Sequence, residues 1–321
     1  MSALLRFAVL IPLIFSLVAF VLTNLALFAG HQKGFMEEYA VIRLNTSMLG
    51  QDMFQSDDSS DSSSSSSDDD GDSLWDKITD KVDDIKDDVK GKIRDIVGDI
   101  ADDLADELGI SDWYSLHIMN ACMGSFGPNA TTSHYKLNTT NCTSSSPANR
   151  FNLTEILDHQ LSIGPLDLNL ADIHWPGSIQ SSIDTLNGAL LALFVFYVLG
   201  VGFSGLSMLA CVPAFLLLQQ QQQQPGKRLV LMVNAALALL AAATITLGSI
   251  IATAASAVAV SAINDKGEPV TLVATQGGKF YGLTWAAAAL MIVSALFWVG
   301  KFAWLWKKEK RERERYSKER F

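Results

Sequence analysis

Charged residues are scarce in this chain of 321 residues, making up 18% of it, against about 25% in a typical soluble domain. The scarcity is uneven: 28 of the 34 acidic residues lie in residues 31–187, which hold only 10 basic residues, a local net charge of −18. The remaining segments are almost uncharged or basic. A single globular core is therefore excluded, and so is a nucleic-acid binder, because the acidic block would repel phosphate.

Motifs of common catalytic sites are also missing. The chain has no nucleophile elbow, no phosphate-binding glycine loop and no HExxH zinc motif. Its carboxylates follow one face of a predicted helix instead of forming a pair that flanks a cleft. We therefore expect a non-enzymatic protein with no cofactor and no bound metal.

Long apolar runs, by contrast, are frequent. Four of them can cross about 30 Å of hydrocarbon, which takes about 20 residues at helical rise. They are continuously apolar, without the alternation of barrel strands, so only helices fit. The sequence thus predicts an all-α membrane protein with four transmembrane helices, in residues 1–30, 188–218, 229–263 and 283–306.

The first run has an alternative interpretation as a cleaved signal peptide. Its uncharged stretch from Phe7 to Gly30 is longer than the usual apolar region of such peptides, about 7–15 residues. It also carries Asn24, a side chain that can hydrogen-bond a neighbouring helix. A retained helix is the favoured prediction.

Basic residues next to the spans predict the orientation. Arg6, the Lys227–Arg228 pair and the tail 307–321, which holds eight basic and four acidic residues, all fall on one side of a four-span protein. By the positive-inside rule this side is the cytosol, together with the loop 219–228. The acidic loop 31–187 and the short loop 264–282 then face outward. Five N-glycosylation sequons agree, since all lie in the first outer loop, at Asn45, Asn129, Asn138, Asn141 and Asn152.

The first outer loop divides by composition. Residues 56–73 are almost entirely serine and aspartate and are predicted to be disordered. In residues 74–109, apolar side chains recur every three or four positions from Trp75 to Leu108, which predicts a long amphipathic helix with an acidic polar face. A third part, residues 110–160, contains two cysteines and four of the sequons.

Cys122 and Cys142 are the only cysteines outside the predicted spans. Two lone thiols in an oxidising compartment most often pair, so we expect a disulfide between them. An intermolecular bridge and a metal site are the alternatives. The metal site has little support, because His117 and His134 do not form a recognised zinc spacing.

The same region resembles the fungal Sur/PalI family of claudin-like tetraspan proteins. The resemblance is carried by the run Asp112–Trp113–Tyr114–Ser115–Leu116–His117, by Cys122 with Gly124 two residues later, by Cys142, and by the segment 152–157. The motif of claudins proper, a tryptophan followed by GLW-x-x-C, is absent. Trp113, Tyr114 and Leu116 are expected to pack behind the disulfide.

This resemblance implies a function that composition does not show. Many members reside in cortical patches called eisosomes, so it implies a non-enzymatic organiser of plasma-membrane subdomains, linked to endocytosis, cell-wall integrity and sphingolipid homeostasis. It also implies membrane lipids and other cortical membrane proteins as partners, in homo- or hetero-oligomers. A PalI-like sensor of external pH or wall stress is the alternative, although those sensors usually have a shorter first loop and a longer tail.

Two further features lie at the predicted cytosolic side. The tail carries a basic cluster that can attract anionic inner-leaflet lipids, or can act simply as a topology signal on a solvated helix. The cluster consists of Lys307, Lys308, Lys310, Arg311, Arg313 and Arg315. Cys211, near the end of the second span, is a candidate for palmitoylation, with a buried inert thiol as the more frequent alternative.

Overall fold

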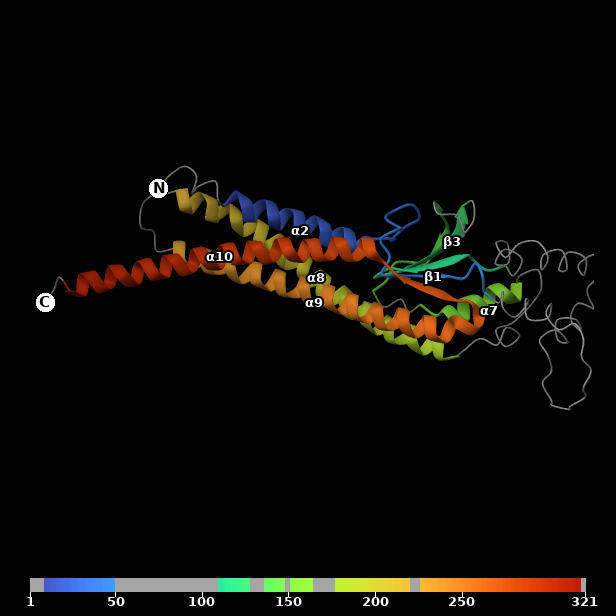
Figure 1. Ribbon diagram of the computed structural model, residues 1–321. Coiled ribbons are helices and arrows are strands. Elements are labelled where there is room, and N and C mark those ends of the chain that lie inside the picture. Colours follow the sequence, from blue (N-terminus) through green and yellow to red (C-terminus); the bar gives the residue numbers. More distant parts are fainter. Residues whose placement is uncertain are drawn as a thin grey trace, which may run out of the picture. The chain divides into compact units, whose positions relative to one another are not determined.

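The computed structural model of the chain describes residues 9–49, 109–127, 136–147, 151–163, 177–219 and 226–318 (Figure 1). The chain divides into two compact units. The helical unit comprises residues 1–29, 189–254 and 278–321, and the sheet unit comprises residues 30–188 and 255–277. The predicted Ser/Asp tract and amphipathic helix, residues 56–73 and 74–109, lie outside the described residues apart from Gly109.

Four long helices confirm the predicted fold class. They are α2 (Leu10–Phe28), α8 (Gly177–Gln219), α9 (Lys227–Gly267) and α10 (Gly278–Lys318). Among the described residues these are the helices long and apolar enough to cross a membrane. Two of them, α8 and α10, extend well past the predicted apolar runs, because polar residues at their ends continue the same helical hydrogen bonding.

Small residues let the helices of the helical unit approach closely. A Cβ atom at Gly200 of α8 would lie 2.6 Å from Ile245 Cγ1 of α9, and one at Gly205 would lie 3.2 Å from the Phe20 ring of α2. On α9 the buried stripe is made largely of alanines, including Ala238 and Ala241. Backbone proximity of this kind maximises van der Waals packing where the hydrophobic effect between helices is absent.

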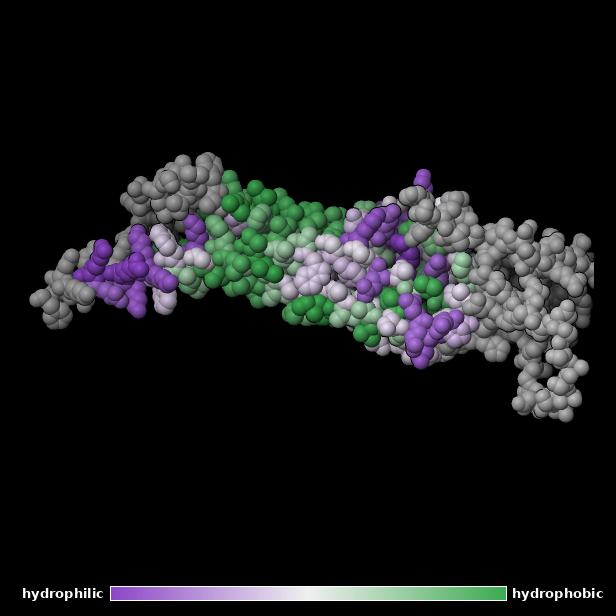
Figure 2. All heavy atoms as spheres, viewed as in Figure 1, coloured by the Kyte–Doolittle hydropathy of each residue, from purple (hydrophilic) through white to green (hydrophobic). Residues whose placement is uncertain are grey.

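A few hydroxyl groups meet inside the helical unit. Ser16 Oγ of α2 lies 3.4 Å from both Ser207 Oγ of α8 and Ser294 Oγ of α10, and all three side chains are buried. On the surface, by contrast, hydrophobic side chains cover these helices, and hydrophilic side chains gather near the end of α10 (Figure 2). The exposed leucines and valines form the surface that lipid would contact.

The sheet unit contains an element that the sequence analysis did not predict, a five-stranded antiparallel sheet. Its strand order is β4-β3-β2-β1-β5. The strands are β1 (Ile42–Asn45), β2 (Trp113–Leu116), β3 (Ala121–Gly127), β4 (Lys136–Cys142) and β5 (Val273–Gln276). Four strands come from the first predicted outer loop and β5 comes from the second.

One face of the sheet is covered by the short helix α7 (Leu153–Ile163). Its apolar stripe, Leu153, Leu157 and Leu161, is almost fully buried. The Tyr114 hydroxyl of β2 donates to Gln160 Oε1 of α7, and Gln160 Nε2 lies 3.6 Å from Met123 Sδ of β3. This face therefore forms the main hydrophobic core of the sheet unit.

Two asparagines join the parts of α8 and α9 that belong to this unit to the rest of it. Asn187 of α8 accepts a hydrogen bond from Phe151 N (3.1 Å) and donates one to Phe151 O (2.9 Å). Asn264 of α9 does the same for Ala274 of β5, at 2.6 and 3.2 Å. Each amide satisfies one residue's backbone donor and acceptor, which would be costly to bury unpaired.

Candidate functional site

The Asp112–His117 run, which carries the family resemblance, forms the central strand of the sheet. All four residues of β2 are buried, and β1 and β3 flank it on the two sides. Ahead of the strand, Asp112 Oδ2 accepts a hydrogen bond from Phe126 N (2.8 Å), which fixes the far end of β3. The motif is therefore the structural centre of the sheet unit.

The Trp113 ring packs directly against Gly124. The Trp113 indole Nε1 donates to Ser125 O (3.0 Å), so the ring lies flat across β3. A Cβ atom at Gly124 would come within 2.8 Å of Trp113 Cζ2 and 2.1 Å of Asn138 O. Since real Cβ atoms do not approach this closely, only glycine fits at the point where β2, β3 and β4 meet.

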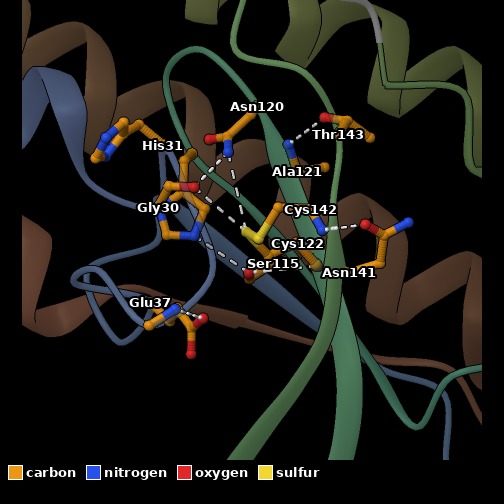
Figure 3. Close-up of a disulfide and its surroundings, with 12 residues drawn as sticks. Gly30, His31, Glu37, Ser115, Asn120, Ala121, Cys122, Asn141, Cys142 and Thr143 are labelled. Atoms are coloured by element: carbon orange, nitrogen blue, oxygen red, sulfur yellow. Dashed lines mark hydrogen bonds between the residues drawn. A yellow bond between two sulfur atoms is a disulfide. The ribbon is translucent and has the colours of Figure 1, made fainter.

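Of the three side chains expected to pack behind the disulfide, Trp113 does so, and the expectation is wrong for Tyr114 and Leu116. Cys122 and Cys142 are bonded and sit directly opposite each other on β3 and β4 (Figure 3). A small cluster on this face contains Trp113, Cys122 and Phe126, with Leu137 and Cys142 packed against it. Tyr114 and Leu116 point to the opposite face, because successive strand residues alternate. Burial there raises the pKa of Tyr114 to about 12.

A buried polar cluster lies beside the disulfide, beneath the segment that follows α2. Gly30 O accepts a hydrogen bond from Asn120 Nδ2 and lies 3.4 Å from Cys122 Sγ (Figure 3). Gly30 has φ +71°, and a Cβ atom there would lie 2.5 Å from the His117 ring. The connector from the first helix is thus pressed against the turn between β2 and β3.

His117 is the central titratable group of this cluster. Its side chain is 1% exposed, and Nε2 lies 3.2 Å from Ser115 Oγ. Burial lowers the pKa of His117 to about 4; the polar Tyr39 backbone nearby opposes this and the charge of Arg43 adds to it. Among the described residues, His117 Nδ1, Asn120 Oδ1 and Arg43 Nε are buried atoms that find no hydrogen-bond partner. The imidazole is therefore neutral at pH values well above 4.

The predicted sequons differ in their surroundings. Asn138 and Asn141 are exposed on β4, an edge strand, whereas Asn45 is half-buried in β1. Asn152 caps α7, accepting from Glu155 N (3.1 Å) and donating to Glu155 Oε2 (3.0 Å). Asn129 lies outside the described residues.

The basic cluster of the tail continues α10 as a helix. All six of its residues, Lys307, Lys308, Lys310, Arg311, Arg313 and Arg315, are exposed. Trp304 and Trp306 precede them and are each 54% exposed, with Lys308 Nζ 6.0 Å from the centre of the Trp304 ring. Trp285 lies 19 residues before Trp304 on the same helix, which is about 28 Å at helical rise and matches the hydrocarbon thickness.

Cys211 of α8 is a free cysteine, and its side chain is 1% exposed. Acylation of this thiol would require it to leave its buried position. For metals, the described ranges contain no cluster of three or more His, Cys, Asp or Glu side chains that could hold an ion.

Comparison with family models gives one match. The model of the SUR7/PalI family matches residues 8–297, a stretch that contains all five strands and reaches from α2 into α10. The chain belongs to the SUR7/PalI family. No curated protein and no solved structure matches it significantly. In this SUR7/PalI protein the family match and the four apolar helices together identify a multi-pass membrane protein.

Sequence reasoning missed several residues that position this site. The sequence gives no sign of the roles of Asn264, Asn187 and Gly30, because each contacts a residue that is not its neighbour along the chain. The strand β5 could have been predicted, since Val273-Ala274-Thr275 has β propensity and lies between two helical runs. Nothing in the sequence indicates which strand it would join.

Proposed function

We propose that this SUR7/PalI protein is a non-enzymatic organiser of a fungal plasma-membrane subdomain of the eisosome type. Links to endocytosis, cell-wall integrity and sphingolipid homeostasis are part of the proposal. The observation that carries it is the family match over residues 8–297. A four-helix unit with an apolar surface and a braced sheet unit supports a scaffolding role, because both present rigid surfaces to neighbours.

The proposed orientation places both termini in the cytosol and the sheet unit outside. Three observations support it: the basic residues beside the spans, the disulfide, and the sequons on exposed positions of β4. The pairing of β1 with β5 adds a fourth, because the segments that follow the first and third spans must then lie on one side of the membrane.

Membrane lipids are the proposed partners of the helical unit and of the tail. The exposed basic cluster on α10 would contact anionic headgroups of the inner leaflet, contributing up to about 1 kcal/mol per well-placed charge. The lipid-facing leucines and valines offer contacts to sphingolipid-rich bilayer or to other cortical membrane proteins. A homo- or hetero-oligomer is part of this proposal.

Imaging of a C-terminal fluorescent fusion, expressed at its native level, tests the organiser role. Stable cortical patches are the expected result, with altered patch shape and sphingolipid sensitivity in a deletion strain. A uniform rim or a vacuolar-membrane signal would contradict it. Glycosidase treatment of the same strain tests the orientation, since an unchanged mobility would remove the support for an outer sheet unit.

A PalI-like sensor of external pH or wall stress is the second candidate. It is favoured by the buried imidazole of His117, which lies in the field of Arg43 under the connector from the first helix. Protonation there would place a second positive charge in a buried cluster and loosen it. A deletion strain that fails only at altered external pH, with normal patches, would support the sensor over the organiser.

A further inference from the structure

The sequon Asn141–Cys142–Thr143 is unusual because its middle residue forms the disulfide. Figure 3 shows all three residues together with their partners on β3. Cys142 is bonded to Cys122, which is fully buried, and the two form a directly opposed pair in the β3·β4 ladder. The Cα atoms of the pair are 4.0 Å apart, the close spacing of a pair that exchanges no backbone hydrogen bonds.

The hydroxyl of Thr143 and the side-chain oxygen of Asn141 are both engaged in the folded chain. The Thr143 hydroxyl accepts a hydrogen bond from Ala121 N (3.0 Å), while Thr143 N donates to Ala121 O (2.8 Å). The Asn141 side-chain oxygen accepts from Cys142 N (2.9 Å). The disulfide and these bonds hold residues 141–143 as one continuation of the ladder.

The neighbouring sequon Asn138–Thr139–Thr140 lies on the same strand but is open. The side chains of Asn138 and Thr140 are exposed, and neither makes a hydrogen bond to another described residue. An irregularity in the β3·β4 register lets Asn138 and Asn141, three residues apart, oppose Ser125 and Met123. These two residues lie on one face of β3, so the two acceptor asparagines share a face.

Glycan transfer needs both groups of a sequon to be reachable. The amide Nδ2 forms a bond to the anomeric carbon of a sugar, whose bond to a lipid-linked pyrophosphate breaks, and one amide proton leaves with the pyrophosphate. The hydroxyl two residues on must be free to bind the transferase. Closure of the disulfide removes two protons and two electrons from the thiols, which pass to a disulfide oxidoreductase of the secretory compartment.

We propose that Asn141 accepts an N-glycan only until the Cys122–Cys142 bond closes, so that its occupancy records the redox conditions during folding. Asn138 remains an acceptor after closure. If the glycan is added first, it lies outside the fold on the exposed Asn141, and the disulfide can still close. If the disulfide closes first, the glycan can no longer be added to Asn141. This inference rests on the outer placement of the sheet unit proposed above.

Site occupancy in the Cys122→Ser variant tests the inference, because this change leaves the sequon 141–143 intact. The full chain is expressed in its membrane, the glycans are released by an amidase in ¹⁸O-water, and each asparagine is scored by peptide mass spectrometry. Occupancy of Asn141 should rise about twofold or more over the wild type, with Asn138 and Asn152 unchanged as internal controls. Repeating the measurement in Asn138→Gln removes competition from the neighbouring glycan.

A second arm uses the unaltered chain, so that a misfolded variant cannot produce the result alone. A brief pulse of membrane-permeant reductant during synthesis should raise Asn141 occupancy in the same direction. Equal Asn141 occupancy with and without the disulfide, or an equal rise at Asn138, would overturn the inference. A chain without glycan at any of its asparagines, in every arm, would instead contradict the outer placement itself.

Discussion

Asn264 and Ala274 are joined by two hydrogen bonds, one to the backbone N–H and one to the carbonyl of the edge strand β5. The amide of α9 thereby occupies the place where a sixth strand would pair. Exposed strand edges promote pairing between molecules, so this contact closes one of the two edges of the sheet. It also fixes the segment that contains β5 to the end of α9.

Asn264→Ala should destabilise the sheet unit by about 1–3 kcal/mol, because Ala274 loses both partners in a partly buried position. Limited proteolysis of the purified protein in nanodiscs, followed against denaturant, would measure this. Asp265→Ala is the matched control, since Asp265 is exposed and forms an ion pair with the exposed Lys266 (3.4 Å). Equal stability of the two variants would contradict the edge-closing role.

Gly30→Ala should disrupt the polar cluster beside the disulfide. The new methyl group would meet the His117 ring at 2.5 Å, and the residue would also have to keep φ +71°. Gly34→Ala separates the two effects, because Gly34 has φ +85° with no atom within 4 Å of its Cβ position. We expect a loss of about 1 kcal/mol for Gly34→Ala from backbone strain alone, and clearly more for Gly30→Ala. Thermal unfolding, monitored through the accessibility of the disulfide, would rank the two variants by their loss of stability.

Gly124→Ala should separate β3 from β4, since its Cβ atom would overlap Asn138 O at 2.1 Å. Gly127→Ala, on the same strand, has Lys136 O at 3.9 Å, which is an ordinary contact, and should be tolerated. The fraction of chains with a closed Cys122–Cys142 bond, scored by thiol labelling, is the readout. If both variants closed the bond as fully as the wild type, the packing of Trp113 on Gly124 would not be required.

Acid should weaken the sheet unit through His117. The pKa of His117 is about 4 in the folded chain and 6.5 as a free side chain, so the unfolded chain binds the proton first as the pH falls. The stabilisation is fully present above pH 6.5 and is lost progressively between pH 6.5 and about 4, up to about 3 kcal/mol. Unfolding at a series of pH values would show this slope.

His117→Phe should remove that part of the pH dependence, while the exposed His159 offers a control in His159→Ala. The two variants have to be compared with the wild type over the same pH range, because carboxylates add their own dependence at lower pH. A wild-type slope that survives in His117→Phe would assign the titration to another group.

Contact of the tail with anionic lipid should weaken when its basic residues are neutralised and strengthen when its acidic residues are neutralised. Replacing the six bases of the cluster by glutamine should weaken the contact of α10 with anionic vesicle lipids, and high salt should have the same effect. Glu309→Gln with Glu314→Gln should strengthen it, because these changes remove opposing charge. Quenching of a C-terminal fluorophore by labelled anionic lipid in proteoliposomes would report the distance. Identical quenching in all three proteins would exclude a lipid contact of the tail.

Much of the helical unit was predictable, since a run of about 20 apolar residues has few other solutions. The disulfide was predictable as well, because two thiols in one segment between predicted spans have few other partners. The strand β2 was located as a family motif, yet its role as the central strand was not. Residues Trp113–Leu116 carry no alternation of polar and apolar side chains, since both faces of β2 are buried.

The amino-acid sequence alone determined that the chain has four apolar runs long enough to cross a membrane, which segment is acidic, and to which family it belongs. Those properties are local, as they depend on hydropathy, charge and short motifs that can be recognised in a single stretch of chain. Only the tertiary structure decided that β5 joins β1 across more than two hundred residues, and that Gly30 faces His117 and Asn264 faces Ala274. Such pairings depend on closing long loops around a shared core, and the free energy of that closure is not written in the residues of any one segment.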